Sequence, residues 1–115
     1  MRLIASRVRH DSLHIFMSET SDVSFNNKYK FYVYILYSLK DKGLYIGYTE
    51  DLKNRLISHA QGKNSATKLR RPLKLIHYEY FIDKEDAKAR EEFLKSGYGR
   101  IQLKNFLKRT LGSDL

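Results

Sequence analysis

The chain has 115 residues, a length that suits one domain with a single modest core. Its 22 basic and 13 acidic side chains give a formal net charge of +9, which favours a polyanionic partner, most commonly nucleic acid, although such charge can also serve solubility alone. The sequence contains no cysteine, which excludes disulfides and thiolate zinc sites, and its longest apolar run, residues 31–37, is too short to cross a bilayer. We therefore expect the protein to act in a reducing aqueous compartment, the cytoplasm, and not in a membrane.

Residues 1–30 have no sustained helical or strand period, and we expect them to form a disordered N-terminal extension. Within this extension, residues 1–16 are interpreted as a mis-assigned start that precedes the natural initiator, Met17. The folded domain is expected to span residues 31–111, and residues 112–115 are expected to form a C-terminal tail.

Two β-branched and aromatic segments predict a hairpin, because "FYVYILYSL" and "GLYIGY" are separated by the turn sequence "KDKG". A hairpin that pairs residue 38 with 45 and residue 36 with 47 places Tyr34 and Tyr45 on one face of the sheet, together with Gly47. A change of register by one residue would put the two tyrosines on opposite faces.

A helix is predicted after the hairpin, with Thr49 as its N-cap and Gly62 at its end. Glu50 and Asp51 are expected in its first turn, where the helix dipole favours anions. Apolar residues recur at helical spacing and are expected to face the core. They are Leu52, Leu56 and Ala60.

Arg55 and His59 are four residues apart and therefore lie on one stripe of this helix, beside the apolar stripe. One interpretation is that Arg55 forms a surface ion pair with Asp51 while His59 is solvated. The other is that both side chains emerge next to the sheet and serve a functional site.

Three further elements follow in the sequence. Pro72 precedes a strand over residues 73–81, and Asp83 caps a helix over residues 84–95 that is closed by Ser96 and Gly97. A last helix is predicted from about Gly99 to Leu111, with one apolar side formed by Leu103, Phe106, Leu107 and Thr110. The order ββαβαα predicts an α+β fold in which helices cover a small antiparallel sheet.

The predicted helix over residues 84–95 carries a glutamate that leans towards the core. Helical phase places Glu91 beside the inward-facing Ala87 and Leu94, whereas Glu92 turns towards water. Because an unpaired buried carboxylate is costly, Glu91 needs a partner. Arg55 or Lys95 could supply a structural ion pair, and a divalent cation such as Mg²⁺ is the functional alternative.

Basic residues form two clusters in the sequence, one in the loop before the third strand and one near the C-terminus. A solvated face and contact with nucleic-acid phosphates both account for such clusters, and the second predicts steep salt dependence. The residues that we assign to nucleic-acid binding are Lys63, Lys68, Arg70, Arg71, Arg100 and Lys104.

Several segments in this order resemble the GIY-YIG nuclease superfamily: "YVYIL", "YIG", "DLKNRLISHAQGK", "SATKLRRPLKLIHYEYF" and "AREEFLKSGYGR". More narrowly, the chain is similar to small single-domain bacterial proteins related to the N-terminal domain of the excision-repair nuclease. The resemblance covers Tyr32 to about Leu111. It implies a three-stranded antiparallel sheet flanked by helices, and the hydrolysis of DNA phosphodiester bonds with one divalent cation, Mg²⁺ or Mn²⁺.

The resemblance also implies roles for five residues, all proposed as catalytic. Tyr34 and Tyr45 match the tyrosines of the first and second motifs, and Arg55 matches the arginine that contacts the scissile phosphate. His59 matches a histidine that some members use, and Glu91 matches the single glutamate that binds the metal.

This sequence departs from the family pattern in three respects. Tyr32 stands where larger members have glycine, and Tyr48 stands where many repair members have lysine, so that phosphate stabilisation would depend more on Arg55 and the loop cations. The asparagine that closes the site in the excision-repair nuclease has no clear counterpart.

Three functions are therefore compatible with the sequence. The first is a metal-dependent endonuclease that acts in DNA repair or processing, and the second is a catalytically silent DNA- or RNA-binding module of the same fold. The third is a protein-interaction domain whose charge gives only solubility. The sequence leaves the oligomeric state open.

Overall fold

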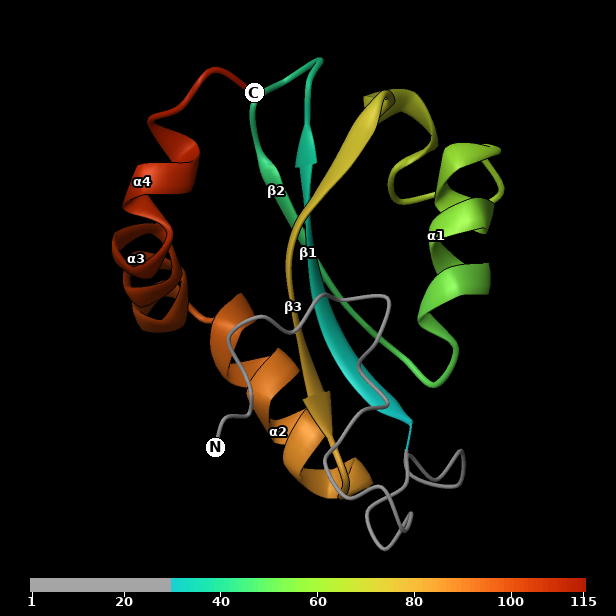
Figure 1. Cartoon of the computed structure of the whole chain (residues 1–115), viewed down its shortest axis with the longest axis vertical. Helices are drawn as coiled ribbons and strands as arrows, with labels where there is room; N and C mark the ends of the chain where they lie inside the picture. Colours follow the sequence, from blue (N-terminus) through green and yellow to red (C-terminus); the bar gives the residue numbers. More distant parts are fainter. Residues whose placement is uncertain (1–29) are drawn as a thin grey trace, which may run out of the picture.

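A three-stranded antiparallel sheet with the order β2-β1-β3 forms the centre of the computed structural model, which describes residues 30–115 (Figure 1). β1 spans Phe31–Ser38, β2 spans Leu44–Thr49 and β3 spans Leu73–Phe81. The predicted α+β fold is confirmed. The expected extension before residue 30, with its proposed start at Met17, lies outside the described residues.

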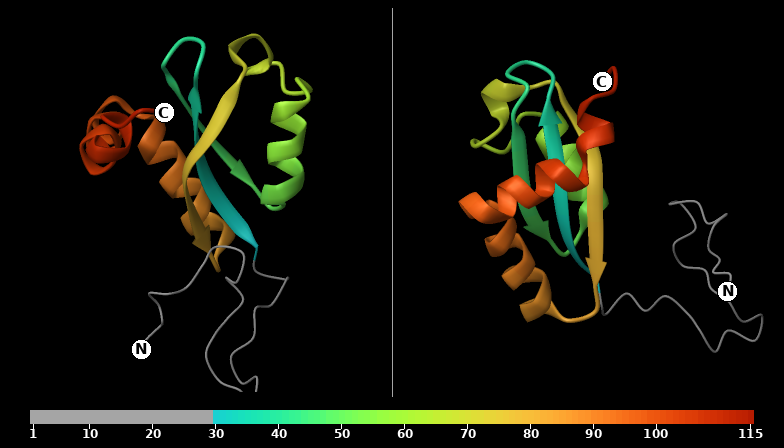
Figure 2. Two further views of the ribbon diagram at one scale, coloured as in Figure 1. Left: turned by 45° about the horizontal axis from the view of Figure 1, so that its top comes forward. Right: turned by 90° about the vertical axis from the view of Figure 1, so that its left-hand side faces the viewer.

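Helices cover both faces of this sheet (Figure 2). One face is covered by α1, which spans Leu52–Ala60, and the short 3₁₀ helix η2 spans Lys68–Arg70 in the loop that leads to β3. The other face carries α2 (Lys84–Lys95), α3 (Gly97–Phe106) and α4 (Lys108–Leu111). None of the helices among residues 30–115 has both the length and the apolar character that a transmembrane span requires.

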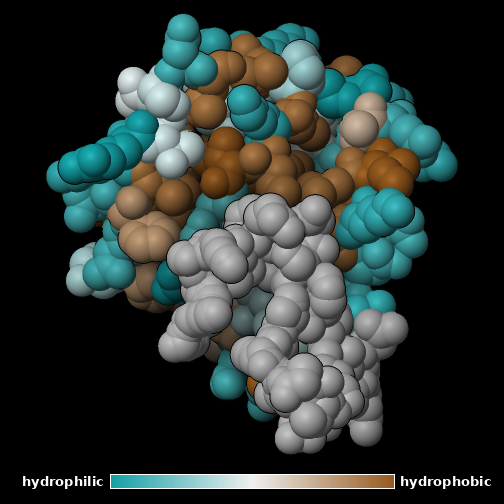
Figure 3. Space-filling view, in the orientation of Figure 1, coloured by the Kyte–Doolittle hydropathy of each residue, from teal (hydrophilic) through white to brown (hydrophobic). Residues whose placement is uncertain are grey.

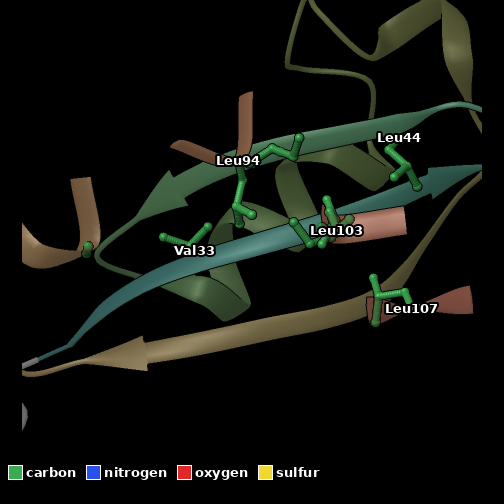
Figure 4. Packing of buried hydrophobic residues seen from close by; sticks show 8 residues of the cluster. Val33, Leu44, Leu94, Leu103 and Leu107 are labelled. Atoms are coloured by element: carbon green, nitrogen blue, oxygen red, sulfur yellow. The ribbon is translucent and has the colours of Figure 1, made fainter. Parts of the chain in front are cut away.

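The two faces of β1 contribute to different layers, because successive side chains of a strand point in opposite directions. Val33 and Ile35 are buried against Leu94 of α2 and Leu103 of α3, and this cluster forms the hydrophobic core (Figure 4). Tyr34 lies on the opposite face, below α1. Hydrophobic residues gather across the centre of the face seen in Figure 3, and hydrophilic residues lie mostly around them.

The register of the hairpin differs from the predicted one by two residues. Tyr34 pairs with Gly47 and Leu36 pairs with Tyr45, whereas we expected residue 36 to pair with 47 and residue 38 with 45. The loop is longer than expected because Ser38 bonds back to Gly43, with Ser38 N donating to Gly43 O over 2.9 Å. A shift of two residues keeps every side chain on its face, so the prediction that Tyr34 and Tyr45 share a face is confirmed.

The start of α1 and the side that it buries were both predicted wrongly. Asp51 is the N-cap in place of Thr49, since its carboxylate accepts a hydrogen bond from Asn54 N over 3.1 Å, and Asp51 therefore precedes the first turn. Ala60 is exposed, and His59 is the one buried residue of Leu52–Ala60. The stripe of Arg55 and His59 thus turns towards the sheet more than the leucine stripe does.

The C-terminal part of the chain forms two helices in place of the predicted single helix from Gly99 to Leu111. α3 begins at Gly97, where Ser96 Oγ accepts a hydrogen bond from Gly99 N over 3.0 Å, and it ends at Phe106, with Leu107 as its C-cap. Phe106, which was expected on the buried side, is 66 % exposed, while Leu103 and Leu107 are buried. The predicted N-cap of α2, Asp83, is confirmed, since its carboxylate accepts from Glu85 N over 2.8 Å.

The junction of α2 and α3 yields a test of the fold. A Cβ atom on Gly99 would overlap the carbonyl oxygen of Phe93 and lie 2.9 Å from Leu94 Cα, whereas a Cβ on Gly97 would meet nothing within 4 Å. We expect Gly99→Ala to lower the free energy of unfolding by at least about 2 kcal/mol because the two backbones must move apart. Gly97→Ala should be neutral or stabilising by about 0.5 kcal/mol. Urea unfolding measures both, and equal midpoints for the two variants would contradict this packing.

Candidate active site

Three buried polar side chains form a hydrogen-bonded chain between β1, α1 and the loop before η2. The hydroxyl of Tyr34, a residue with 0 % exposure, lies 2.8 Å from Nε2 of His59. Nδ1 of His59 lies 2.7 Å from Oγ1 of Thr67, which is also buried. Each ring nitrogen of His59 therefore has one partner, and the tautomer of the imidazole decides which group donates in each bond.

Tyr45 completes an aromatic cluster around His59. The ring centroid of Tyr45 lies 5.2 Å from that of His59 and 6.2 Å from that of Tyr34, and the Tyr45–His59 contact is edge-to-face. Because Tyr45 is only partly buried, it forms the solvent-facing side of the cluster.

Gly47 provides the space that the Tyr34 ring occupies. Gly47 is paired directly with Tyr34 in the β1–β2 ladder, and a Cβ atom on Gly47 would lie 2.5 Å from the Tyr34 hydroxyl oxygen. Any side chain at this position would displace the ring from its contact with His59. The glycine of the "YIG" sequence is therefore required by the site and not by a turn.

Arg55 lies one helical turn before His59 and points to the same side of α1. Its Nη1 donates a hydrogen bond to the carbonyl oxygen of Tyr48 over 3.2 Å, which fixes the half-buried guanidinium at the end of β2. Its positive charge acts on both Tyr34 and His59 and favours a lower pKa for each group. Asp51 is bonded to Asn54, so the surface ion pair that was the alternative interpretation does not form.

Burial dominates the protonation of the cluster. It raises the pKa of Tyr34 to about 12, although the nearby Arg55 guanidinium opposes the shift. Burial, assisted by Arg55, lowers the pKa of His59 below its usual value of 6.5. At neutral pH the pair is therefore a neutral phenol beside a neutral imidazole.

Glu91 lies on α2, apart from the other four candidate residues. Its side chain is 19 % exposed and forms an ion pair of 2.8 Å with Lys95, as the sequence suggested. The charge of Glu91 acts on Tyr48, whose pKa is raised to about 12 mainly by burial and by its hydrogen bond to Glu50. The structure brings Tyr34, Tyr45, Arg55 and His59 together and gives Glu91 no direct hydrogen bond to them.

The acidic groups limit the kind of metal site that is possible. No group of three His, Cys, Asp or Glu side chains that could hold a metal gathers anywhere in residues 30–115. A partly exposed carboxylate such as Glu91 fits a hard cation that keeps most of its water, which is the coordination that Mg²⁺ prefers. Lys95 is 51 % exposed and can move away from Glu91 when a cation binds. Glu91 would therefore be the metal's single protein ligand.

The predicted nucleic-acid-binding residues lie in different surroundings. Lys63 and Lys68 are exposed in the loop after α1, whereas Arg71 donates hydrogen bonds to the carbonyl oxygens of Lys68 and Ala60 over 3.1 and 3.2 Å. Arg70 forms an ion pair with Asp41 over 2.6 Å, so both arginines also hold the loop in place. Arg100 and Lys104 lie on α3, on the face of the sheet opposite to Tyr34.

Thr67 is the member of the cluster that the sequence did not predict. A lone threonine between basic residues in a loop has no period and no helical neighbour that would single it out. Thr67 joins the cluster because the loop folds against His59.

Comparisons with known proteins show which family this chain resembles. The family model described as the GIY-YIG catalytic domain matches residues 30–105. The UPF0213 protein SpyM50708 of Streptococcus pyogenes serotype M5 (strain Manfredo) is 45 % identical over 74 residues, which is 64 % of this chain and 79 % of that protein. The UPF0213 protein SPs0786 of serotype M3 (strain SSI-1) is similar to the same extent. The solution NMR structure of the UPF0213 protein BH0048 from Bacillus halodurans is 38 % identical and covers 66 % of this chain and 83 % of that one, with a TM-score of 0.43.

The lowered pKa of His59 predicts how stability depends on pH. Between the folded-state pKa and the unfolded value of 6.5, the unfolded chain binds more protons than the folded chain, so the free energy of unfolding should fall as the pH drops below about 6.5. In His59→Gln this part of the pH dependence should be absent. Urea unfolding at about pH 7.5 and about pH 5.5 tests this. Equal pH dependence in wild type and His59→Gln would contradict the neutral buried imidazole.

Proposed function

This chain belongs to the GIY-YIG family, and we propose that it is a metal-dependent endonuclease that hydrolyses DNA phosphodiester bonds in the cytoplasm, with a role in DNA repair or processing. One observation carries the proposal: a second phenol, a guanidinium and an imidazole gather around the phenol of Tyr34. Such a group can hold a phosphodiester and move a proton beside it.

Arg55 would bind the scissile phosphate. One of its N–H groups is used by the carbonyl of Tyr48, which orients the planar guanidinium, and the remaining donors are available to phosphate oxygens. The substrate phosphate would then lie close to the Tyr34 hydroxyl, whose pKa already responds to Arg55.

Tyr34 and His59 would activate the attacking water together. Since the pKa of Tyr34 is about 12, a phenolate is not present at rest, and the phenol must lose its proton as it accepts one from water. Nε2 of His59, 2.8 Å away, is the acceptor, and Nδ1–H then donates to Oγ1 of Thr67. Tyr45, at the solvent-facing side, would assist in positioning the water.

Substrate binding would itself make His59 a better base. Arg55 lowers the pKa of His59 in the free protein, in addition to the larger effect of burial. A phosphate bound to Arg55 offsets that positive charge, so the pKa of His59 should rise when the substrate is in place. The proton acceptor is thus most effective when the DNA is bound.

Glu91 would hold the divalent cation, Mg²⁺ or Mn²⁺, in exchange for its ion pair with Lys95. When bound, the cation would stabilise the negative charge that develops on the leaving oxygen.

A second candidate function is a silent module that binds DNA or RNA without cleaving it. The ion pair between Glu91 and Lys95 favours this alternative, because the proposed metal ligand is already neutralised. This alternative predicts binding that weakens with salt and survives the loss of Glu91.

The first test of the proposed function replaces the metal ligand. We expect Glu91→Ala to reduce the metal-dependent nicking of plasmid DNA by about 100-fold or more, while the circular dichroism spectrum stays native. Glu92→Ala is the matched control, since Glu92 is the exposed neighbour on the same helix. Rates are measured with Mg²⁺, with Mn²⁺ and with a chelator.

Single-stranded, flap and four-way-junction DNA extend the same assay. The endonuclease proposal would be overturned if wild type cleaves none of these substrates with either metal. Binding without cleavage, retained by Glu91→Ala, would favour the silent module.

The second test concerns the proton path. Thr67→Val removes Oγ1 with little change of volume and leaves Nδ1 of His59 without its partner, so we expect slower nicking and a shifted pH profile. Thr67→Ser keeps the hydroxyl and should restore both. Nitrogen chemical shifts of His59 report the tautomer directly, and an unchanged tautomer and pH profile in Thr67→Val would refute this role.

A further inference from the structure

A cavity lies on the face of the sheet opposite to the Tyr34–His59–Thr67 chain. Its volume is about 430 Å³, and it lies between the end of the β1–β2 hairpin and helices α3 and α4. Its lining combines four cationic side chains with an apolar wall. The principal lining residues are Lys42, Arg70, Arg100, Lys104, Tyr37 and Leu44.

Three separate segments supply the four cations. Lys42 comes from the hairpin loop, Arg70 from η2, and Arg100 and Lys104 from successive turns of one side of α3. The sequence placed the loop arginine and the α3 pair in different clusters, and the fold joins them around one cavity. Lys42 was not predicted in either cluster.

The cavity carries an excess of positive charge that the carboxylates of the described residues, 30–115, do not neutralise. Arg70 is paired with Asp41 through contacts of 2.6 and 3.1 Å, and this arginine holds the pKa of the Asp41 carboxyl well below its usual range. No carboxylate of residues 30–115 forms an ion pair with Lys42, Arg100 or Lys104. Four cations and one carboxylate therefore leave three positive charges at the cavity.

Lys42 occupies a backbone conformation that lysine rarely adopts. Its φ of 65° lies in the left-handed region, which glycine and asparagine adopt more readily than residues with long side chains. Residues held in such conformations are found most often where the side chain serves a function. In this position Lys42 lines the cavity together with Arg70.

The apolar wall and the cations together match one kind of ligand. Tyr37 and Leu44 are paired across the β1–β2 ladder and form one side of the cavity, where an aromatic ring can contact a base. Lysine and arginine side chains bind phosphate oxygens. We propose that this cavity is a second phosphate-binding site, which takes the backbone of a nucleic-acid strand on the face opposite to the candidate active site. The assignment of a strand as the ligand rests on the proposed function.

The loop around η2 connects the two sites over the end of the sheet. Thr67 contacts His59 on the α1 face, and Arg70, three residues later, reaches the hairpin beside Leu44 on the other face. The loop is fixed there because Ser38 Oγ donates to Arg70 O over 2.6 Å and Lys40 Nζ donates to Leu69 O over 3.1 Å. A strand that leaves the active site past the exposed Lys68 can continue around this end to the cavity.

The test compares two double variants that each lose two positive charges, one variant inside the cavity and the other outside it. Arg100→Gln/Lys104→Gln removes two cations from the cavity, and Lys108→Gln/Arg109→Gln removes two exposed cations of α4 that do not line it. Fluorescence anisotropy measures the affinity for a labelled single strand of about 20 nucleotides at several salt concentrations. We expect the cavity variant to bind about 10-fold more weakly, with a salt slope reduced by about 1.5, and the control to bind within about twofold of wild type. Equal losses in both double variants would overturn the site.

A single substitution that should leave folding unchanged provides an independent test of the site. Lys42→Asn removes one cation and suits a φ of 65°, so it should lower the affinity about threefold without loss of stability in urea. Unchanged affinity in Lys42→Asn would count against the site even if the α3 variant failed to fold.

Two further arms separate this inference from the proposed function and from a free anion as the ligand. Binding is measured without cleavage, so cavity variants that weaken binding support the site even if wild type never cuts DNA. Normal cleavage together with unaltered binding in those variants would overturn the second phosphate-binding site and leave the endonuclease proposal intact. In ¹⁵N-labelled protein, shifts of Lys42, Arg100 and Lys104 with pyrophosphate but not with the oligonucleotide would overturn the strand assignment.

Discussion

The hydrogen bond between Tyr34 and His59 is the contact on which the organisation of this protein depends. His59 is the one buried residue of Leu52–Ala60, so this helix packs on the sheet through an imidazole where most helices use a leucine. Thr67 bonds to the other ring nitrogen and thereby attaches the following loop to the same point. No buried side-chain nitrogen or oxygen within residues 30–115 lacks a partner, so this polar contact does not leave a desolvated group unpaired. The contact that holds α1 in place and the centre of the candidate active site are therefore the same.

The two faces of the central strand β1 contribute separately to the hydrophobic core and to the candidate active site. Val33 and Ile35 belong to the hydrophobic core under α2 and α3, and Tyr34, between them in sequence, belongs to the site under α1. Because alternate side chains of one strand serve both purposes, the position of the site is fixed by the packing of the opposite face. A rigid sheet of this kind holds catalytic groups in place better than loops would.

The positive charge at the candidate active site belongs to a larger basic surface. Burial keeps the phenol and the imidazole neutral, while Arg55, which forms no ion pair with a carboxylate of residues 30–115, provides a positive charge beside them. Under the proposed function, a phosphate bound to Arg55 would supply a negative charge, and the protonation of the cluster would then depend on whether substrate is bound. The loop around η2 and the cavity near α3 extend the positive charge beyond the site, which is how a small basic domain can hold a long polyanion.

The sequence alone determined the features that depend on local pattern. Strand alternation gave the shared face of Tyr34 and Tyr45, and the long helix of residues 84–95 had enough turns to fix the phase of Glu91 against Glu92. The ordered motifs identified the family, which the match over residues 30–105 confirms. Only the tertiary structure decided that His59 turns inward, that Thr67 meets it, and that Lys42, Arg70 and Arg100 surround one cavity. The physical reason is that short helices and loops take their orientation from partners distant in the sequence, and a hydroxyl that needs a hydrogen bond, such as that of Tyr34, leaves no periodic trace in the chain.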